Sequence, residues 1–495
     1  MTVSLTKKTL VSSAFSSAAQ ILSKLLGLLS TLVVARVLAP EVFAVAALLS
    51  ITLYFVDVLG DVASETYILQ KRRVSYFDLH SAWSLNLVIK TGCCLLLIAL
   101  APFAAAFFEQ PSLTSPLQAA TLVLPLKASC SVHFLKLKRH LKYGALTLAT
   151  LIERAGATIL LISCALLYEN VWAFVFADIG GAVLLLGASY LISKQRPIFM
   201  LVKIKEQWMF SKWLLGKQIA GYLRSQLDTL LVAKFFSATV TGHYYMARDV
   251  AMLPGRFLLG PAIEPLIASF RSETIQGKAL LEKVAVSYCV ALLIATPITV
   301  FVNYFADIVV LALLGEQWAL ASSFMPYLIF LFFYWVVLQI TEQGLISQGK
   351  VSFLFFFDVL SLLFIAFVLL VALKVKMDIL WVIEARVGAG FLLTGLAVGI
   401  LYSKQWKALI GVFVNLLAFA FISVGSGEAA AFVASHIALL WAPFKLAIIS
   451  IVFGAVYIVL TFSYMFWLSP KVYRGQLIFI FQEAWTTLSA LRRSH

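Results

Sequence analysis

The chain has 495 residues, of which 62% are hydrophobic and 12% charged, and its mean hydropathy is +0.98. Soluble domains carry about 25% charged residues, so this composition excludes a protein whose main solvent is water. The formal net charge of +15 could suggest nucleic acid, but the basic residues gather in short loops between apolar runs. That distribution is typical of membrane topology, and we therefore expect no nucleic-acid partner.

The apolar runs predict an all-α, polytopic membrane protein. A bilayer core of about 30 Å needs about 20 apolar residues per helix, and lipid offers no hydrogen-bond partners to any other backbone. About fourteen transmembrane helices are expected. In chain order they lie at 9–36, 41–68, 81–107, 114–135, 143–168, 171–193, 211–236, 241–270, 284–304, 319–347, 351–374, 379–402, 405–425 and 437–468, with 308–314 as a loop or partial turn.

The charge distribution predicts the orientation. If the N-terminus with Lys7 and Lys8 is cytoplasmic, the basic loops fall on the cytoplasmic side and mostly acidic ones outside, and both termini are cytoplasmic. Lys374 and Lys376 are the exception, and a missed or extra span within 351–402 would repair it. The first apolar run continues into a full span, so no cleaved segment is expected.

The loops and cysteines argue against catalysis and metal binding. No predicted loop exceeds roughly 20 residues, which leaves no room for a catalytic domain, so we expect a transporter and not an enzyme. The five cysteines fall inside apolar runs without CxxC spacing and predict packing residues, with no metal site.

An internal repeat divides the chain. The segment LSTLVVARVLAPEVFAVAALL (29–49) aligns with LDTLLVAKFFSATVTGHYYMA (227–247), with Leu29 on Leu227 and Arg36 on Lys234. The alternative is chance similarity between apolar helices. The repeat predicts two pseudo-symmetric six-helix lobes, 1–203 and 204–403, with a cavity at their interface, followed by two additional helices and a cytoplasmic tail in 404–495.

Several motifs follow the order of a known family. ARVLAPEVFAVAAL (35–48) matches an Ala-Arg-x-Leu-Gly-Pro-Glu-x-Phe-Gly pattern, with Ala39 and Ala44 in place of the glycines. The others are ETYILQKR (65–72), APFAAAFFEQP (101–111), LKRHLKYGAL (137–146), LPGRFLLGPAIEPLIASF (253–270), LGEQW (314–318) and LISQGK (345–350). Over roughly residues 9–405 the chain resembles the polysaccharide or O-antigen flippases of the multidrug/oligosaccharidyl-lipid/polysaccharide exporter superfamily, particularly the colanic-acid and teichuronic-acid exporter type.

The resemblance implies a flippase of the bacterial inner membrane, built from two six-helix lobes. It would translocate an undecaprenyl-diphosphate-linked oligosaccharide by alternating access, for exopolysaccharide, O-antigen or capsule synthesis. The implied partners are the lipid-linked oligosaccharide, membrane lipids, and a polysaccharide polymerase and glycosyltransferases. No cofactor is expected, and transport could be coupled to an H⁺ or Na⁺ gradient.

Charged residues inside spans indicate a polar cavity, because an ionisable group facing lipid costs several kcal/mol. Gln20 and Lys24 lie on one stripe of the first span, and Lys217, Arg224 and Asp228 on one stripe of the seventh. Because Arg and Lys bind phosphate oxygens through charge-assisted hydrogen bonds, Lys24 and Arg224 are the first candidates for binding the diphosphate. The alternative is that these cations snorkel to the interface or pair with acids such as Asp228 and Asp57.

A second set of charges lies in the first lobe. Asp57, Asp61 and Glu65 share one face of the second span, and Lys90 lies in the third. These carboxylates could carry protons coupled to transport, or one could neutralise Lys90, which is otherwise a further cation for the substrate. Arg154 and Arg248 are secondary candidates, since each adjoins an acid that points about 100° away and must pair elsewhere.

Three other functions remain open. An ion-coupled exporter of small organic cations should have an acidic cavity, which the Lys24 and Arg224 stripes oppose. A membrane polysaccharide polymerase should have a long periplasmic loop, which is missing from the predicted topology. A non-transporting scaffold would not need charges deep in the membrane.

Overall fold

The computed structural model describes residues 22–71, 73–140, 143–193, 195–202, 204–263, 270, 277–403, 405–437 and 441–467. Within these residues all regular structure is helical, with no strand. Ten helices are long and apolar enough to cross a membrane. The prediction of an all-α polytopic membrane protein is confirmed, whereas the count of fourteen spans is not.

The difference in the count has identifiable causes. The first part of the first predicted span, 9–21, lies outside the described residues, which begin with a shorter apolar helix, Leu22–Ala35. The fourth span is broken into short helices. The seventh, α9 (Ile204–Phe235), carries more charged residues than the membrane-crossing helices do. The eighth contains α10 (Ala238–Ala251), which has 14 residues and is too short to cross a membrane.

The described residues form two compact units. The first comprises the part up to Tyr245 together with Asp358–Leu362, and the second comprises Met246–Phe357 and the part from Leu363 onward. The predicted lobe boundaries at 203 and 403 remain a prediction.

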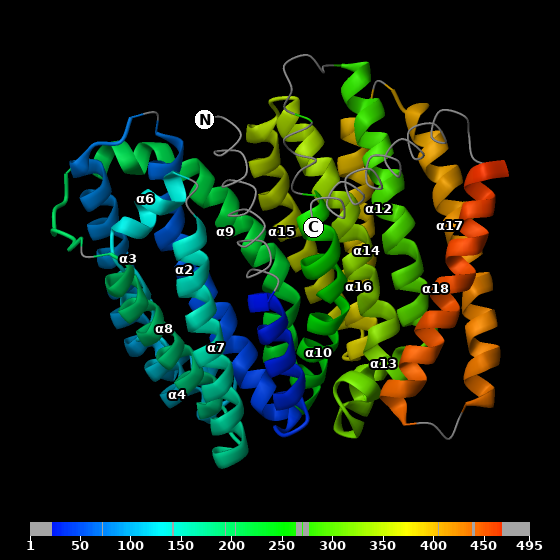
Figure 1. The fold of residues 1–495 in the computed structure, drawn as a ribbon, viewed down its shortest axis with the longest axis horizontal. Helices are drawn as coiled ribbons and strands as arrows, with labels where there is room; N and C mark the ends of the chain where they lie inside the picture. Colours follow the sequence, from blue (N-terminus) through cyan, green and yellow to red (C-terminus); the bar gives the residue numbers. More distant parts are fainter. Residues whose placement is uncertain are drawn as a thin grey trace, which may run out of the picture. The chain divides into compact units, whose positions relative to one another are not determined.

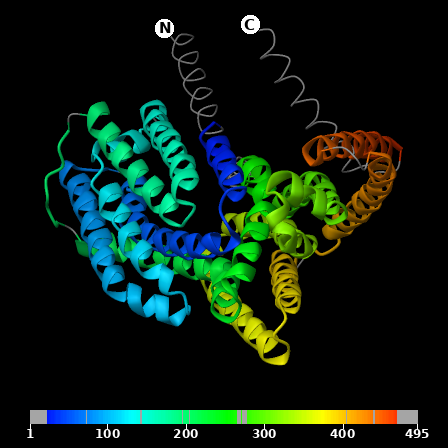
Figure 2. The same ribbon diagram turned by 90° about the horizontal axis from the view of Figure 1, so that it is seen from below.

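The first unit is built around α2 (Pro40–Gln70) and α3 (Tyr76–Phe107), which pack against each other. Pro40 begins α2, and Ser75 and Asp78 form a capping box at the start of α3, so both helices begin where the sequence provides a start signal. Around them lie α7 (Tyr143–Tyr168) and α8 (Trp172–Ile192), side by side in both views (Figures 1 and 2), and α9, which packs on α2.

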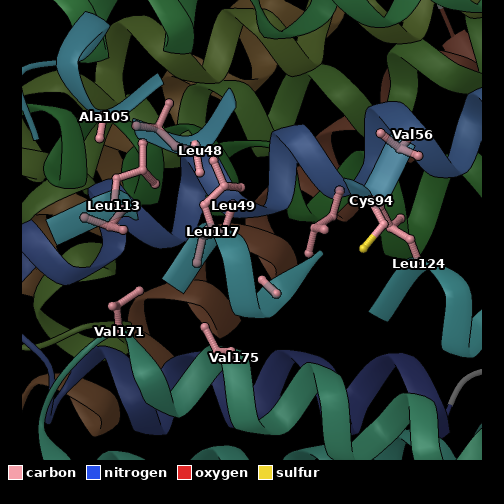
Figure 3. Close-up of a cluster of buried hydrophobic side chains, with 14 of the residues drawn as sticks. Leu48, Leu49, Val56, Cys94, Ala105, Leu113, Leu117, Leu124, Val171 and Val175 are labelled. Atoms are coloured by element: carbon pink, nitrogen blue, oxygen red, sulfur yellow. The ribbon is translucent and has the colours of Figure 1, made fainter. Parts of the chain in front are cut away.

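The apolar core of this unit draws on α2, α3, α8 and the short helices between α3 and α7. Figure 3 shows Leu48 and Leu49 of α2 close to Leu113 and Leu117, with Val171 and Val175 near α8. Burial of this apolar cluster stabilises the packing of the helices that bear the charged residues of the unit.

The fourth predicted span, 114–135, is not one continuous helix. It consists of α4 (Thr114–Ala120), α5 (Val123–Ala128) and α6 (His133–Arg139), separated by short non-helical stretches. Non-helical backbone at membrane depth is tolerated only where protein covers it or a water-filled cavity adjoins it. We therefore expect the break to be covered by other side chains of the first unit or to adjoin a cavity.

The second unit contains the remaining helices. They are α12 (Lys278–Tyr304), α13 (Ala306–Leu313), α14 (Ala319–Ser347), α15 (Val351–Val375, apart from its Asp358–Leu362 segment), α16 (Ile379–Leu401), α17 (Ala408–His436) and α18 (Ala442–Trp467). The last two, orange and red, are neighbours in both views and pack on α12 and α13 (Figures 1 and 2).

Two expectations for this part of the chain can be compared with the structure. Residues 308–314 were expected to form a loop or partial turn, but 308–313 belong to α13 and Leu314 follows as its C-cap. The apolar stretch there can pack against α14 and α18. Between 351 and 402 there are two helices, as predicted, so no extra span explains Lys374 and Lys376. After Pro254 the chain forms a π-helical turn, Gly255–Leu259.

The helix starts agree with the predicted repeat. Leu29 and Leu227 are aligned at an offset of 198 residues, and α10 begins at Ala238, which is 198 residues after α2 begins at Pro40. Both helices follow a short break after the preceding helix, so the similarity extends from sequence to local structure.

Candidate functional site

The polar stripe predicted on α9 lies around a buried carboxylate. Arg224 Nη2 is 3.2 Å from Asp358 Oδ1, and the side chain of Asp358 is only 4% exposed. Lys217, two turns earlier on α9, also interacts electrostatically with Asp358. Between them Gly221 leaves room, since a Cβ there would lie 3.9 Å from Asp358 Oδ2. The structure thus joins two of the predicted diphosphate cations to one acid.

Asp358 lies on α15, so its pair with Arg224 joins two helices that are far apart in the sequence. It was not among the partners considered for Arg224, which were Asp228 and Asp57. Asp228 is fully buried one turn further along α9, where Oδ2 accepts a 2.6 Å hydrogen bond from the hydroxyl of Tyr244 on α10. Sequence position alone placed Asp228 next to Arg224 but could not show that α15 supplies another acid beside it.

Lys24 differs from Arg224 in its surroundings. It lies in the helix Leu22–Ala35 with an exposed side chain, and it makes no ion pair with the described residues. Gln20, predicted on the same stripe, lies outside the described residues. Among the predicted diphosphate ligands, Lys24 is therefore a cation whose charge the described part of the chain leaves uncompensated.

The second and third spans place Lys90 against Asp57. Lys90 Nζ is 2.7 Å from Asp57 Oδ1, and the lysine side chain is 5% exposed. Gly60 of α2 makes this approach possible, because a Cβ there would lie 2.7 Å from Lys90 Cε and 2.4 Å from Asn86 Oδ1. Asp57 was expected either to carry a proton or to neutralise Lys90, and the structure shows it paired with Lys90. The side chain of Asp61 lies outside the described residues.

Two further ion pairs surround the same region. Glu65 accepts from Lys138 of α6 at 2.7 Å, and Lys127 of α5 lies 3.4 Å from Glu153 of α7. Lys127 was not predicted as a site residue, and Lys138 was assigned to a loop, because the sequence pattern suggested an unbroken fourth span. Together with Lys90 and Asp57 these groups border a cavity of about 270 Å³ inside the first unit, whose lining includes Glu65, Lys127 and Lys138.

The secondary candidates have different surroundings. Arg154 is exposed on α7 and interacts electrostatically with Asp178 of α8, an acid that the sequence analysis did not single out. Arg248 is half-buried on α10, and its neighbour Asp249 pairs with Arg256 at 2.6 Å. The expectation that adjacent opposite charges pair elsewhere is confirmed for Glu153 and for Asp249.

The segment after α8 is held to α3 by side chains. His80 Nδ1 accepts from the N–H of Ile198 at 2.9 Å, and Ser84 Oγ accepts from that of Met200 at 2.9 Å. Lys71 binds both Asp78 of α3 and Glu206 of α9, at 3.1 and 2.8 Å. Burial acts to lower the pKa of Lys71, but its hydrogen bonds to Glu206, Tyr67 and Asp78 outweigh this effect and raise the pKa above the usual value. This junction therefore ties α2, α3 and the start of α9 together.

The described residues contain no group of three or more His, Cys, Asp or Glu side chains arranged to hold a metal ion. The cysteines are all free thiols, two of them buried.

Comparison with known proteins gives a consistent result. A family described as "Polysaccharide biosynthesis protein" matches residues 33–323. The succinoglycan biosynthesis transport protein ExoT of Rhizobium meliloti is 21% identical over 345 residues, covering 65% of this chain and 70% of that protein. The lipopolysaccharide biosynthesis protein WzxC of Escherichia coli is 24% identical over 342 residues, covering 66% of each chain.

Solved structures show the same fold. The lipid II flippase MurJ, in an inward closed conformation, matches with a TM-score of 0.72 and 13% identity over 91% of this chain and 98% of that one. A multidrug resistance MATE family transporter of the MOP superfamily matches with a TM-score of 0.55 and 11% identity over 77% of this chain and 96% of that one. The similarity to transporters of this superfamily therefore extends along most of the chain.

Proposed function

Since the chain belongs to the polysaccharide biosynthesis protein family, we propose that it is a flippase that moves an undecaprenyl-diphosphate-linked oligosaccharide across the bacterial inner membrane. The match of the family over residues 33–323 carries the proposal, and the fold shared with a lipid II flippase supports it. The product would serve exopolysaccharide, O-antigen or capsule synthesis, with a polymerase and glycosyltransferases acting beside it. The chain would cross the membrane many times with both termini in the cytoplasm.

Binding of the diphosphate falls to Lys24 and Arg224. Lys24 is exposed and makes no ion pair with the described residues, so its ammonium can meet a phosphate oxygen without first leaving another partner. Arg224 is held by Asp358 at 3.2 Å, and Lys217 adds positive potential at the same place. An arriving diphosphate would replace Asp358 as the partner of Arg224, since its charge is larger and its oxygens fit the guanidinium fork.

Coupling to an H⁺ or Na⁺ gradient is part of the proposal, with Asp57, Glu65 and Asp228 as the candidate carboxylates. Each has a partner, Lys90, Lys138 and Tyr244 respectively. Ion binding at these acids would therefore require a pair to separate, which links coupling to a change of conformation. The same pairing opposes an exporter of organic cations, which needs a carboxylate available to its substrate.

The test is leaflet exposure of a fluorescent undecaprenyl-diphosphate oligosaccharide in proteoliposomes, read with a membrane-impermeant sugar-modifying reagent. Protein-dependent exposure of the inner pool is expected. Lys24→Ala should slow it about 10- to 100-fold, because a hydrogen bond to a charged group contributes about 1.5–3 kcal/mol. Lys374→Ala, which removes another exposed lysine at the end of α15, is the matched control and should retain the wild-type rate.

Two results would contradict the proposal. If no exposure occurs with several oligosaccharides and ion gradients, the chain does not flip this class of lipid. If Lys24→Ala and Lys374→Ala are equally active, Lys24 does not bind the diphosphate.

A further inference from the structure

The cavity inside the first unit is lined in part by Trp83, Asn86 and Lys127, to which the proposed diphosphate contact and ion coupling assign no role. It has a volume of about 270 Å³ and is bordered by α2, α3, the α5–α6 region and α8. Pockets for drug-sized ligands span about 300–1,000 Å³, so this one suits a smaller group. It is too small for the oligosaccharide and too polar for the lipid chain.

The wall of the cavity is charged but balanced. Lys90 pairs with Asp57 at 2.7 Å, and Lys138 pairs with Glu65 at 2.7 Å. The third lysine of the wall, Lys127, has its counter-charge in Glu153 at 3.4 Å. An ion could bind here only after one of these pairs separates, whereas an uncharged ligand can bind with all the pairs intact.

The same pairs offer hydrogen bonds to an uncharged ligand. The side chains of Asp57 and Glu65 remain 27% and 23% exposed, and a carboxylate has more acceptor positions than one ammonium uses. Asn86 adds a buried carbonyl oxygen, Oδ1, that has no hydrogen-bond partner in the described part of the chain. Leaving such a group unpaired is unfavourable, and a ligand hydroxyl would satisfy it.

The backbone break in the fourth span forms another part of the wall. In this break the carbonyl of Cys130 accepts a 2.8 Å hydrogen bond from Trp83 Nε1, and the N–H of Ser131 donates to Ser189 Oγ at 3.0 Å. Side chains thus satisfy the backbone groups that the missing helix turn would have paired. Discontinuous helices of this kind line substrate sites in membrane transporters. The bond to Cys130 also fixes the ring of Trp83, whose indole lines the cavity.

We propose that this cavity binds one uncharged sugar ring of the transported oligosaccharide, with the paired carboxylates and Asn86 holding its hydroxyls and Trp83 packing against its apolar face. A ring of carbon and hydroxyl groups matches a wall that combines balanced charges, an unpaired amide oxygen and an indole. The inference rests on the proposed function, because it assumes an oligosaccharide substrate. It assigns the sugar contact to the first unit alone and not to the diphosphate cations.

Saturation-transfer NMR on the detergent-solubilised full chain tests this, with glucose, galactose and N-acetylglucosamine as probes and sodium chloride and sodium phosphate as competing ions. At least one sugar should saturate with a Kd on the order of 1 mM, as expected for a small polar ligand. Asn86→Leu, which keeps the volume but removes the amide, should weaken binding about 3- to 10-fold. Trp83→Phe should also weaken it, whereas Trp172→Phe, outside the cavity, should not.

Each contrary result overturns the assignment. Absence of a saturable signal from all three sugars excludes a sugar site. Displacement of the sugar by sodium or phosphate would make the cavity an ion site. Equal affinity in Asn86→Leu, Trp83→Phe and Trp172→Phe would place binding elsewhere. Equilibrium binding does not need translocation, so the two proposals can fail separately. A protein that flips the lipid but binds no sugar contradicts only this inference. A protein that binds sugar but does not flip the lipid contradicts only the proposed function.

Discussion

Replacing each partner of the Arg224–Asp358 pair should have unequal effects on stability. Arg224→Met leaves the carboxylate of Asp358, 4% exposed, without its nearest cation. Removing one member of a buried pair costs about 3–5 kcal/mol, and the electrostatic support of Lys217 places this case near 3 kcal/mol. Asp358→Asn leaves Arg224, which is 17% exposed and can be hydrated, so about 1 kcal/mol is expected. The double variant Arg224→Met/Asp358→Leu removes both charges and should regain most of the loss.

Denaturation by SDS gives the unfolding free energies, and the flipping assay then separates structure from transport. If Arg224 binds diphosphate, the double variant is stable and inactive, while Asp358→Asn transports. A double variant that is both stable and as active as the wild type would refute the role of Arg224 in binding. Equal destabilisation by the two single variants would refute the argument from burial.

Three further predictions concern the first unit. Lys90→Met should lower the free energy of unfolding by about 2–3 kcal/mol, because its partner Asp57 stays charged, and exchanging the two residues should restore part of the loss. Gly242→Ala should cost about 3 kcal/mol, since the added Cβ would lie 1.8 Å from a backbone carbonyl oxygen at the start of α2; a thermal midpoint equal to the wild type would contradict this. Lys71→Met should speed chymotryptic cleavage of the segment after α8. The raised pKa of Lys71 contributes stability that is complete below about pH 10.5 and lost only above it, so the change in cleavage should be the same at about pH 6 and about pH 9.

Much of the fold could be predicted because span length and apolar composition depend on the bilayer alone. The predicted span 143–168 and the observed α7 coincide, and 379–402 differs from α16 by one residue. The fourth span shows where this reasoning fails. The break in it is stabilised by Trp83, Ser189 and Tyr190 from other helices, which local sequence cannot reveal.

The candidate site was predictable by residue type but not by partner. Helical phase placed Lys217, Arg224 and Asp228 on one stripe of α9, and all three side chains are half-buried or buried there. Helical phase could not identify Asp358 as a partner of Arg224. Asp358 lies on α15, and the sequence alone does not show that α15 packs beside α9 at this point. The same limit applies to Lys127 and Glu153, whose pairing depends on the packing of α5 and α7.

The pairing of charges in the first unit has a consequence for transport. A carrier that exposed bare arginine and lysine side chains in the membrane would pay a desolvation penalty in every state without substrate. Asp358 pairs with Arg224, and in the proposed mechanism it would be displaced when a phosphate arrives. Part of the attraction of Arg224 for a diphosphate would thereby be offset, so the proposed lipid substrate would be held less tightly and could be released in the opposite leaflet. Lys24 has no such competitor among the described residues, and it is the better candidate for the first contact with the head group.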